Sequence, residues 1–195
     1  MSGKSQLPPK ASRLHEAESA RADIIFIHGL GSSHKGAWGT NWKDWLPKDC
    51  PGANIWGVRY YAPIADVLHE SNALPEIAES VLDCLEQQGI GDRPYCILAH
   101  SLGGLVAKQV LTRAAKTSGD AGISGRALGI VFYATPQRGA RLASRGWPLR
   151  WAAGRQVAEL VPGDKGVVDA HKEFLEFVSR RPGLAAEVLH ETRPT

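Results

Sequence analysis

This sequence of 195 residues has few cysteines, a small net charge and no long apolar run. Its three cysteines, Cys50, Cys84 and Cys96, are an odd number without metal-site spacing. We therefore expect no disulfide framework, no bound metal and a reducing, cytoplasmic compartment. The net charge of +3 does not indicate a nucleic-acid surface. No apolar run approaches the roughly 18 residues of a membrane helix, so we expect a soluble protein, for which peripheral membrane contact stays open.

The hydrophobic residues, 43% of the chain, fall into alternating strand and helix patterns. Residues 1–20 are polar and predict a loose tail or a short edge strand, whereas 21–195 predict one domain. Strands separated by helices, each strand apolar along its length, are typical of a mostly parallel sheet with helices on both faces. The expected strands are 23–27, 53–60, 95–99, 128–134 and 185–190, and the expected helices are 74–85, 102–116 and 167–178.

The segment AHSLGG at 99–104 follows a buried strand and opens a helix, which is the setting of a nucleophile elbow. Such a serine occupies a strained turn, so small residues are required two positions before and after it. Ala99 and Gly103 meet this requirement around Ser101. The turn would lift the Ser101 hydroxyl out of the sheet and direct the Leu102 amide at an oxyanion. The alternative is a plain strand–helix junction with a serine N-cap.

A second motif, HGLGS at 28–32, follows the first apolar strand. Where a nucleophile elbow is present, the second oxyanion donor comes from a loop of this kind, and we assign it to the Leu30 amide. Gly29 and Gly31 would let the backbone approach the substrate, and His28 is expected to brace the loop. The competing interpretation, a dinucleotide-binding fingerprint, lacks its third glycine and the acidic residue after the second strand.

The pair HGLG and AHSLGG, about 70 residues apart, resembles the α/β-hydrolase superfamily. More closely, it resembles the lipase-like group of serine-active-site-containing proteins and GPI inositol-deacylase relatives. The stretches WLP (45–47), PGANIW (51–56), FYATPQRG (132–139) and ETRPT (191–195) are similar to that group as well. Ala134 and Gln137 depart from its glycine and histidine. The resemblance implies a serine ester hydrolase without cofactor, acting on ester or lipid-like substrates.

The partners of the nucleophile are harder to find. In this fold the chain order is serine, acid, histidine. Glu191 is the best acid candidate, although it is equally readable as a solvated strand end. No histidine follows Glu191; His171 is expected on a helix surface, and His190 occupies a strand position. We therefore expect the last strand, its histidine and the final helix to be missing, so that the chain is a fragment or a larger protein supplies them.

Two hypotheses follow. The first is a serine esterase or lipase-like domain with a nucleophile at Ser101, inactive or weak in this chain. The second is a non-catalytic effector or interaction module, which the missing histidine favours. The resemblance extends to the N-terminal domains of large signalling ATPases, so either hypothesis allows further C-terminal domains as partners. Residues 137–163, rich in arginine and tryptophan, predict a lid or lipid-headgroup surface. Their alternative is a solvated helix with its tryptophans turned inward.

Overall fold

The protein is described here by a computed structural model, which covers residues 8–29, 38, 41–61, 73–135 and 165–189. One six-stranded sheet has the order β1-β3-β2-β4-β5-β6. β1 runs antiparallel to β3, and every other neighbouring pair is parallel. The strands are β1 (Lys10–His15), β2 (Ala22–Ile27), β3 (Ala53–Arg59), β4 (Tyr95–His100), β5 (Ala127–Tyr133) and β6 (Ala185–Leu189).

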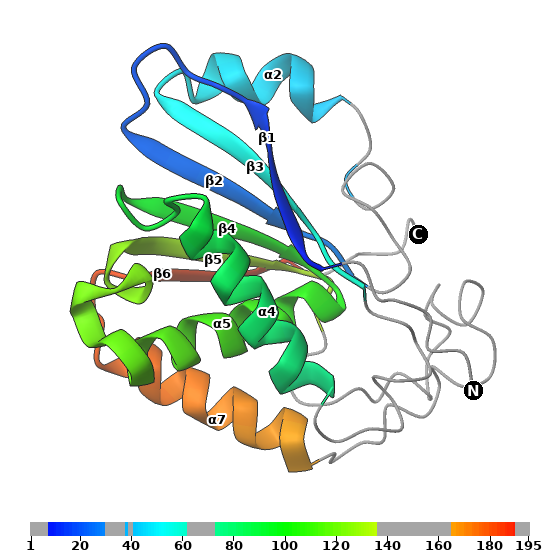
Figure 1. The fold of residues 1–195 in the computed structure, drawn as a ribbon, viewed down its shortest axis with the longest axis vertical. Coiled ribbons are helices and arrows are strands. Elements are labelled where there is room, and N and C mark those ends of the chain that lie inside the picture. Colours follow the sequence, from blue (N-terminus) through cyan, green and yellow to red (C-terminus); the bar gives the residue numbers. More distant parts are fainter. Residues whose placement is uncertain (1–7, 30–37, 39–40, 62–72, 136–164, 190–195) are drawn as a thin grey trace, which may run out of the picture.

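Helices cover both faces of this sheet, as the sequence predicts (Figure 1). On one face, Trp42 and Leu46 of α2 pack against Phe26 of β2. On the other, α4 and α7 flank α5 and contact it. These helices are α2 (Trp42–Asp49), α4 (Ala73–Gln87), α5 (Leu102–Ser118) and α7 (Lys165–Ser179), with short 3-10 turns at Gly119–Ala121 and Ile123–Arg126. None of the described helices is long and apolar enough to cross a bilayer.

The central strands and α5 form the core because they are apolar on every side that another element covers. Ile25, Ile27 and Ile97 are 0% exposed. α5 buries eleven of its residues, far more than the single stripe of an amphipathic surface helix. A helix buried so completely is held rigidly, and it begins at the nucleophile candidate.

Residues 10–15 show which interpretation of the N-terminal segment holds. They form β1 at the sheet edge, paired with β3 through register partners from Lys10 with Arg59 to His15 with Ile55. The edge strand is thus present, and a loose tail is the wrong description of residues 10–15. α2 was not expected, because it has only eight residues and Pro47 inside it.

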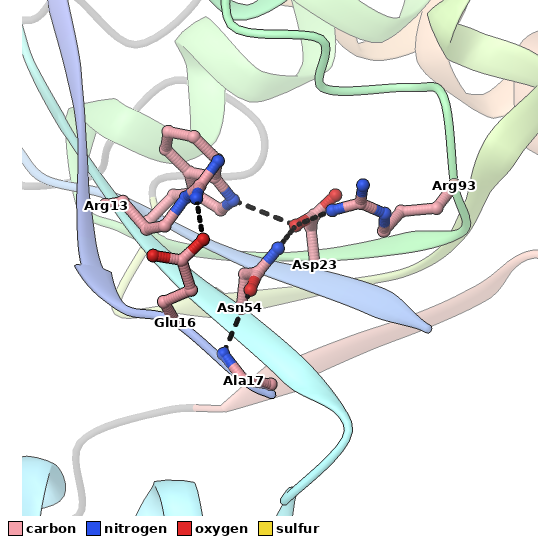
Figure 2. A network of polar contacts seen from close by, with 7 residues as sticks. Arg13, Glu16, Ala17, Asp23, Asn54 and Arg93 are labelled. Atoms are coloured by element: carbon pink, nitrogen blue, oxygen red, sulfur yellow. Dashed lines mark hydrogen bonds and ion pairs between the residues drawn. The ribbon is translucent and has the colours of Figure 1, made fainter. Parts of the chain in front are cut away.

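A buried polar network ties the strands together at their amino ends (Figure 2). Asp23, at the start of β2, is 1% exposed. Its Oδ1 accepts hydrogen bonds from Trp56 Nε1 at 2.9 Å and Asn54 Nδ2 at 3.1 Å. Arg93 lies 3.5 Å from the same oxygen, and Asn54 Oδ1 accepts from the Ala17 amide at 3.1 Å. One carboxylate therefore joins β2, β3 and the loop before β4, on the edge opposite Ser101.

Candidate active site

Ser101 lies between β4 and α5, at the carboxyl edge of the sheet. Its backbone has φ 53° and ψ −125°, so the strained turn that the sequence predicts is present. The Ser101 amide donates to Tyr133 O at 2.9 Å, and the Gly104 amide donates to Ser101 O at 3.0 Å. The Ser101 side chain makes no capping hydrogen bond to the helix. The alternative of an ordinary serine N-cap is therefore wrong.

Two glycines let the end of β2 pack directly against this turn. A Cβ placed on Gly29 would lie 2.8 Å from Ser101 Cβ and 3.2 Å from Ser101 Oγ. A Cβ on Gly103 would lie 2.5 Å from His28 O and 2.6 Å from Ile27 O. Contacts this short leave no room for a side chain. The loop after β2 thus approaches the nucleophile candidate, as the HGLG motif predicts for Gly29.

His28 is held by its surroundings and turned into the protein. It is 2% exposed, its Nδ1 donates to Gly29 O at 2.7 Å, and its ring stacks on Tyr60 at 4.8 Å. The Tyr60 hydroxyl donates to His28 O at 2.5 Å, and burial raises the pKa of Tyr60, so this donor keeps its proton. These contacts suit the expected brace. Tyr60 was missed from the sequence, where only its place at a strand end marks it.

A second left-handed residue lies beside the first. Ala134, directly after β5, has φ 51°, and its amide donates to Leu189 O of β6 at 3.0 Å. Glycine adopts this backbone region without strain, which gives a physical meaning to the departure noted at Ala134. The following residue, Thr135, is 6% exposed. A Cβ on Gly104 would lie 2.2 Å from Thr135 Oγ1, so the threonine packs on the first turn of α5.

The structure thus brings four predicted site residues together: Ser101, Leu102, His28 and Gly29. Leu102 is the first residue of α5, and its amide belongs to the helix end that attracts negative charge. The other site residues that the sequence analysis named lie outside the described residues. These are Leu30, Gly31, His190, Glu191 and the segment 137–163.

Among the histidines that the structure describes, His171 differs from its prediction. It is half-buried rather than on the surface, and its Nδ1 lies 3.1 Å from Lys108 Nζ. The prediction was wrong because the helical pattern of α7 does not reveal a polar partner on α5. Lys108 is seven residues after Ser101, which is about 10 Å along the helix. His171 is therefore engaged away from the elbow.

Lys108 itself was missed, because it is hidden in an apolar helical run. It is 0% exposed, and its Nζ lies 5.2 Å from the centre of the Phe132 ring and 5.7 Å from that of Phe174. Burial lowers the pKa of Lys108 to about 8, because a charged ammonium loses its hydration.

β6 forms one edge of the sheet, next to β5 and the turn at Ala134 (Figure 1). All five of its residues are exposed, including Val188 at 40% and Leu189 at 49%. Among the residues that the structure covers, no strand pairs with the outer side of β6. An edge with open backbone groups and apolar side chains is a place where a further strand can pair.

Comparison with known proteins adds three findings. No family model matches the chain. The mouse protein SERAC1 is 29% identical over 206 residues, which are 92% of this chain and 31% of that protein. Human SERAC1 is 29% identical over 188 residues, 83% of this chain and 29% of that protein. The chain therefore spans about a third of the length of these curated relatives.

Solved structures share the architecture at low sequence identity. Phospholipase PlaB from Legionella pneumophila superposes with a TM-score of 0.63 at 17% identity, over 87% of this chain and 39% of that one. A carboxylesterase of the Thaumarchaeon Nitrososphaera gargenis gives 0.51 at 11% identity, over 98% and 89%. The chain thus has the α/β-hydrolase fold that its motifs predict.

Proposed function

We propose that this chain is the nucleophile-bearing core of a serine ester hydrolase that forms an acyl-enzyme on Ser101. The observation that carries the proposal is the left-handed backbone of Ser101 at a strand–helix turn, packed against Gly29. This conformation costs a non-glycine residue about 1–2 kcal/mol. Such strain persists mainly where a function uses it.

The proposed chemistry is acyl transfer. Ser101 Oγ attacks the ester carbonyl while its proton passes to a base. The negative oxygen is held by the Leu102 amide and by the Leu30 amide. The intermediate then breaks its bond to the alcohol, which takes the proton from the base. Water repeats the sequence on the acyl-enzyme and frees the acid. This chemistry requires neither metal nor cofactor.

The base is proposed to come from outside the described residues. Two described histidines near the carboxyl edge contact other rings, His28 with Tyr60 and His100 with Trp38 and Tyr133. His171 contacts Lys108 farther along α5. The open edge of β6 supports a further strand that brings the histidine, with Glu191 as its acid.

The substrate class is proposed to be esters or lipid-like molecules. The two solved structures compared above are a carboxylesterase and a phospholipase. The family resemblance implies the same class of substrate. The segment 137–163 would act as lid or headgroup surface, in peripheral contact with a membrane. A cytoplasmic location and further domains of a larger protein complete the proposal; the greater length of the relatives supports those domains.

A second candidate function is a hydrolase-fold module that binds a partner without turnover. The specific observation in its favour is that three of the described histidines, His28, His100 and His171, make contacts with other side chains. The two candidates differ in one property, the reactivity of Ser101 once a base is supplied.

That property is measured by fluorophosphonate labelling, with mass spectrometry of the adduct. At neutral pH the 195-residue chain should label weakly, because an unassisted serine is slow. Free imidazole should accelerate labelling by about tenfold or more by acting as the missing base. Ser101→Ala should abolish the adduct, whereas Ser179→Ala, at an exposed serine of α7, should label as wild type does.

The outcomes separate the candidates. Fast labelling without imidazole would place the base within this chain and contradict the external histidine. If imidazole produces no adduct at Ser101, the esterase proposal fails and the binding module is favoured.

A further inference from the structure

The two left-handed turns at the carboxyl edge are neighbours in the sheet. His100 and Tyr133 are register partners, and each directly precedes a residue with positive φ, Ser101 and Ala134. Within the described ranges these two are the only non-glycine residues in that region. The nucleophile proposal explains the turn at Ser101. It does not explain the one at Ala134.

The turn at Ala134 places Thr135 on the first turn of α5. A Cβ on Gly104 would lie 2.2 Å from Thr135 Oγ1, 2.4 Å from its Cγ2 and 2.8 Å from its Cβ. Gly104 is three residues after Ser101, and its amide donates to Ser101 O. The threonine therefore packs on the helical turn that carries the Leu102 amide.

The hydroxyl of Thr135 is buried and has no hydrogen-bond partner among the described residues. A valine of the same shape would fill this space without an unpaired polar atom. Thr112, a buried threonine of α5, has a hydroxyl that is paired. Thr112 Oγ1 donates to Lys108 O at 3.0 Å and lies 3.2 Å from Gln109 O. An unpaired buried hydroxyl beside a strained serine requires an explanation, and functional sites are where such groups occur.

We propose that Thr135 is a positioning residue for acylation of Ser101. Its O–H is free to rotate, since no partner fixes it. When negative charge forms at the N-terminus of α5, the hydroxyl turns its hydrogen toward that end. The reoriented dipole steadies the first turn, so the Leu102 amide keeps its direction. The inference rests on the proposed role of Ser101 and adds a group that the triad and the oxyanion amides do not include.

The test is Thr135→Val, measured by thermal unfolding and by imidazole-assisted fluorophosphonate labelling of Ser101. The melting temperature should stay equal or rise by about 2–5 °C, because an unpaired polar atom is removed. The maximal labelling rate at saturating probe should fall by about tenfold, with the half-saturating probe concentration unchanged. A residue that only supports the fold would not lower the rate while stability holds.

Two further variants make the test specific. Thr135→Ser keeps the hydroxyl and should restore most of the labelling rate. Thr112→Val removes a paired hydroxyl remote from the elbow, so it should label at the wild-type rate and melt lower.

Three results would overturn the inference. The first is wild-type labelling in Thr135→Val. The second is a loss of rate that Thr135→Ser shares, or that a lower melting temperature accompanies. The third is the absence of any Ser101 adduct in wild type, which rejects the proposed function as well; in the first two cases the wild type labels and only the role of Thr135 fails.

Discussion

Two buried polar groups, Asp23 near the amino ends of the parallel strands and Thr135 near their carboxyl ends, differ in how they are paired. At the amino end, Asp23 has an indole, an amide and a guanidinium around one oxygen (Figure 2). At the carboxyl end, Ser101 and Ala134 adopt left-handed backbone and the Thr135 hydroxyl is unpaired. The hydrogen bonds around Asp23 stabilise the sheet. The strained end keeps groups in conformations that the fold alone would not favour, which is expected of a reactive site.

Asp23→Ala should have the largest effect, because it dismantles the network around Asp23. The variant leaves the buried donors of Asn54 and Trp56 unpaired, and each unpaired buried donor costs about 1–3 kcal/mol. Chemical denaturation measures the change in the free energy of unfolding. Asp83→Ala, on the exposed face of α4, serves as the control and should change it by less than about 0.5 kcal/mol. A small effect of Asp23→Ala would show that the network is not what holds the strands.

Lys108 is a buried polar group on α5, seven residues after Ser101. It therefore tests whether destabilising polar groups occur only at the carboxyl ends of the strands. Below pH 8 both the folded and unfolded chains carry the proton, so the folded state bears the full cost of a buried charge. From about pH 8 to the ordinary pKa of 10.5, the unfolded chain binds more protons than the folded chain. Stability therefore rises with pH across this window, by about 3 kcal/mol.

Lys108→Met should remove this pH dependence and stabilise the protein at pH 7. The gain should be about 2 kcal/mol, because the hydrogen bond to His171 is lost as well. Unfolding free energies from pH 7 to 10.5 measure both effects. The control Lys116→Met, at a lysine side chain 62% exposed, should keep the wild-type rise. A Lys108→Met profile that runs parallel to the wild-type profile would show that the amine is not buried as a cation.

Ala134→Gly should give the smallest change and sharpens the comparison at the strained end. Glycine relieves the left-handed strain of about 1–2 kcal/mol, and its greater unfolded-state entropy takes back about 0.5–1 kcal/mol. The net stabilisation should be below about 1 kcal/mol, read as a small rise in melting temperature. Ala186→Gly, on exposed β6, is the matched substitution and should lower it. Destabilisation by both variants would mean that Ala134 is not strained.

Much of the fold was predictable because burial on both faces leaves a local signature. The five parallel strands were predicted within one residue or so of their bounds, and α4, α5 and α7 within about two. The two elements that the sequence left undecided or did not predict, β1 and α2, depend on distant partners. β1 owes its place to pairing with β3, and α2 to the aromatic packing around Phe26.

The site divides in the same way. The elbow and the approach of Gly29 follow from local motifs, so Ser101, Leu102 and His28 were identifiable. Tyr60, Lys108 and the surroundings of Thr135 depend on which elements pack together, and a single sequence does not state that. The structure places Ser101, Leu102, His28 and Gly29 together, but their roles, like those assigned to Leu30, Gly31 and Glu191, stay predictions.

Among the described residues, the two edge strands of the sheet differ in how easily a further strand could pair with them. β1 is antiparallel and carries a register shift between Arg13 and His15, and such irregularities discourage pairing. β6 runs in regular register with β5 and exposes all of its residues. Any extended segment, including β6 of another molecule, competes for the same row of backbone groups. If a strand at that edge supplies the base, a second molecule paired there would exclude that strand. Assembly of the site should then become less complete as the protein concentration rises.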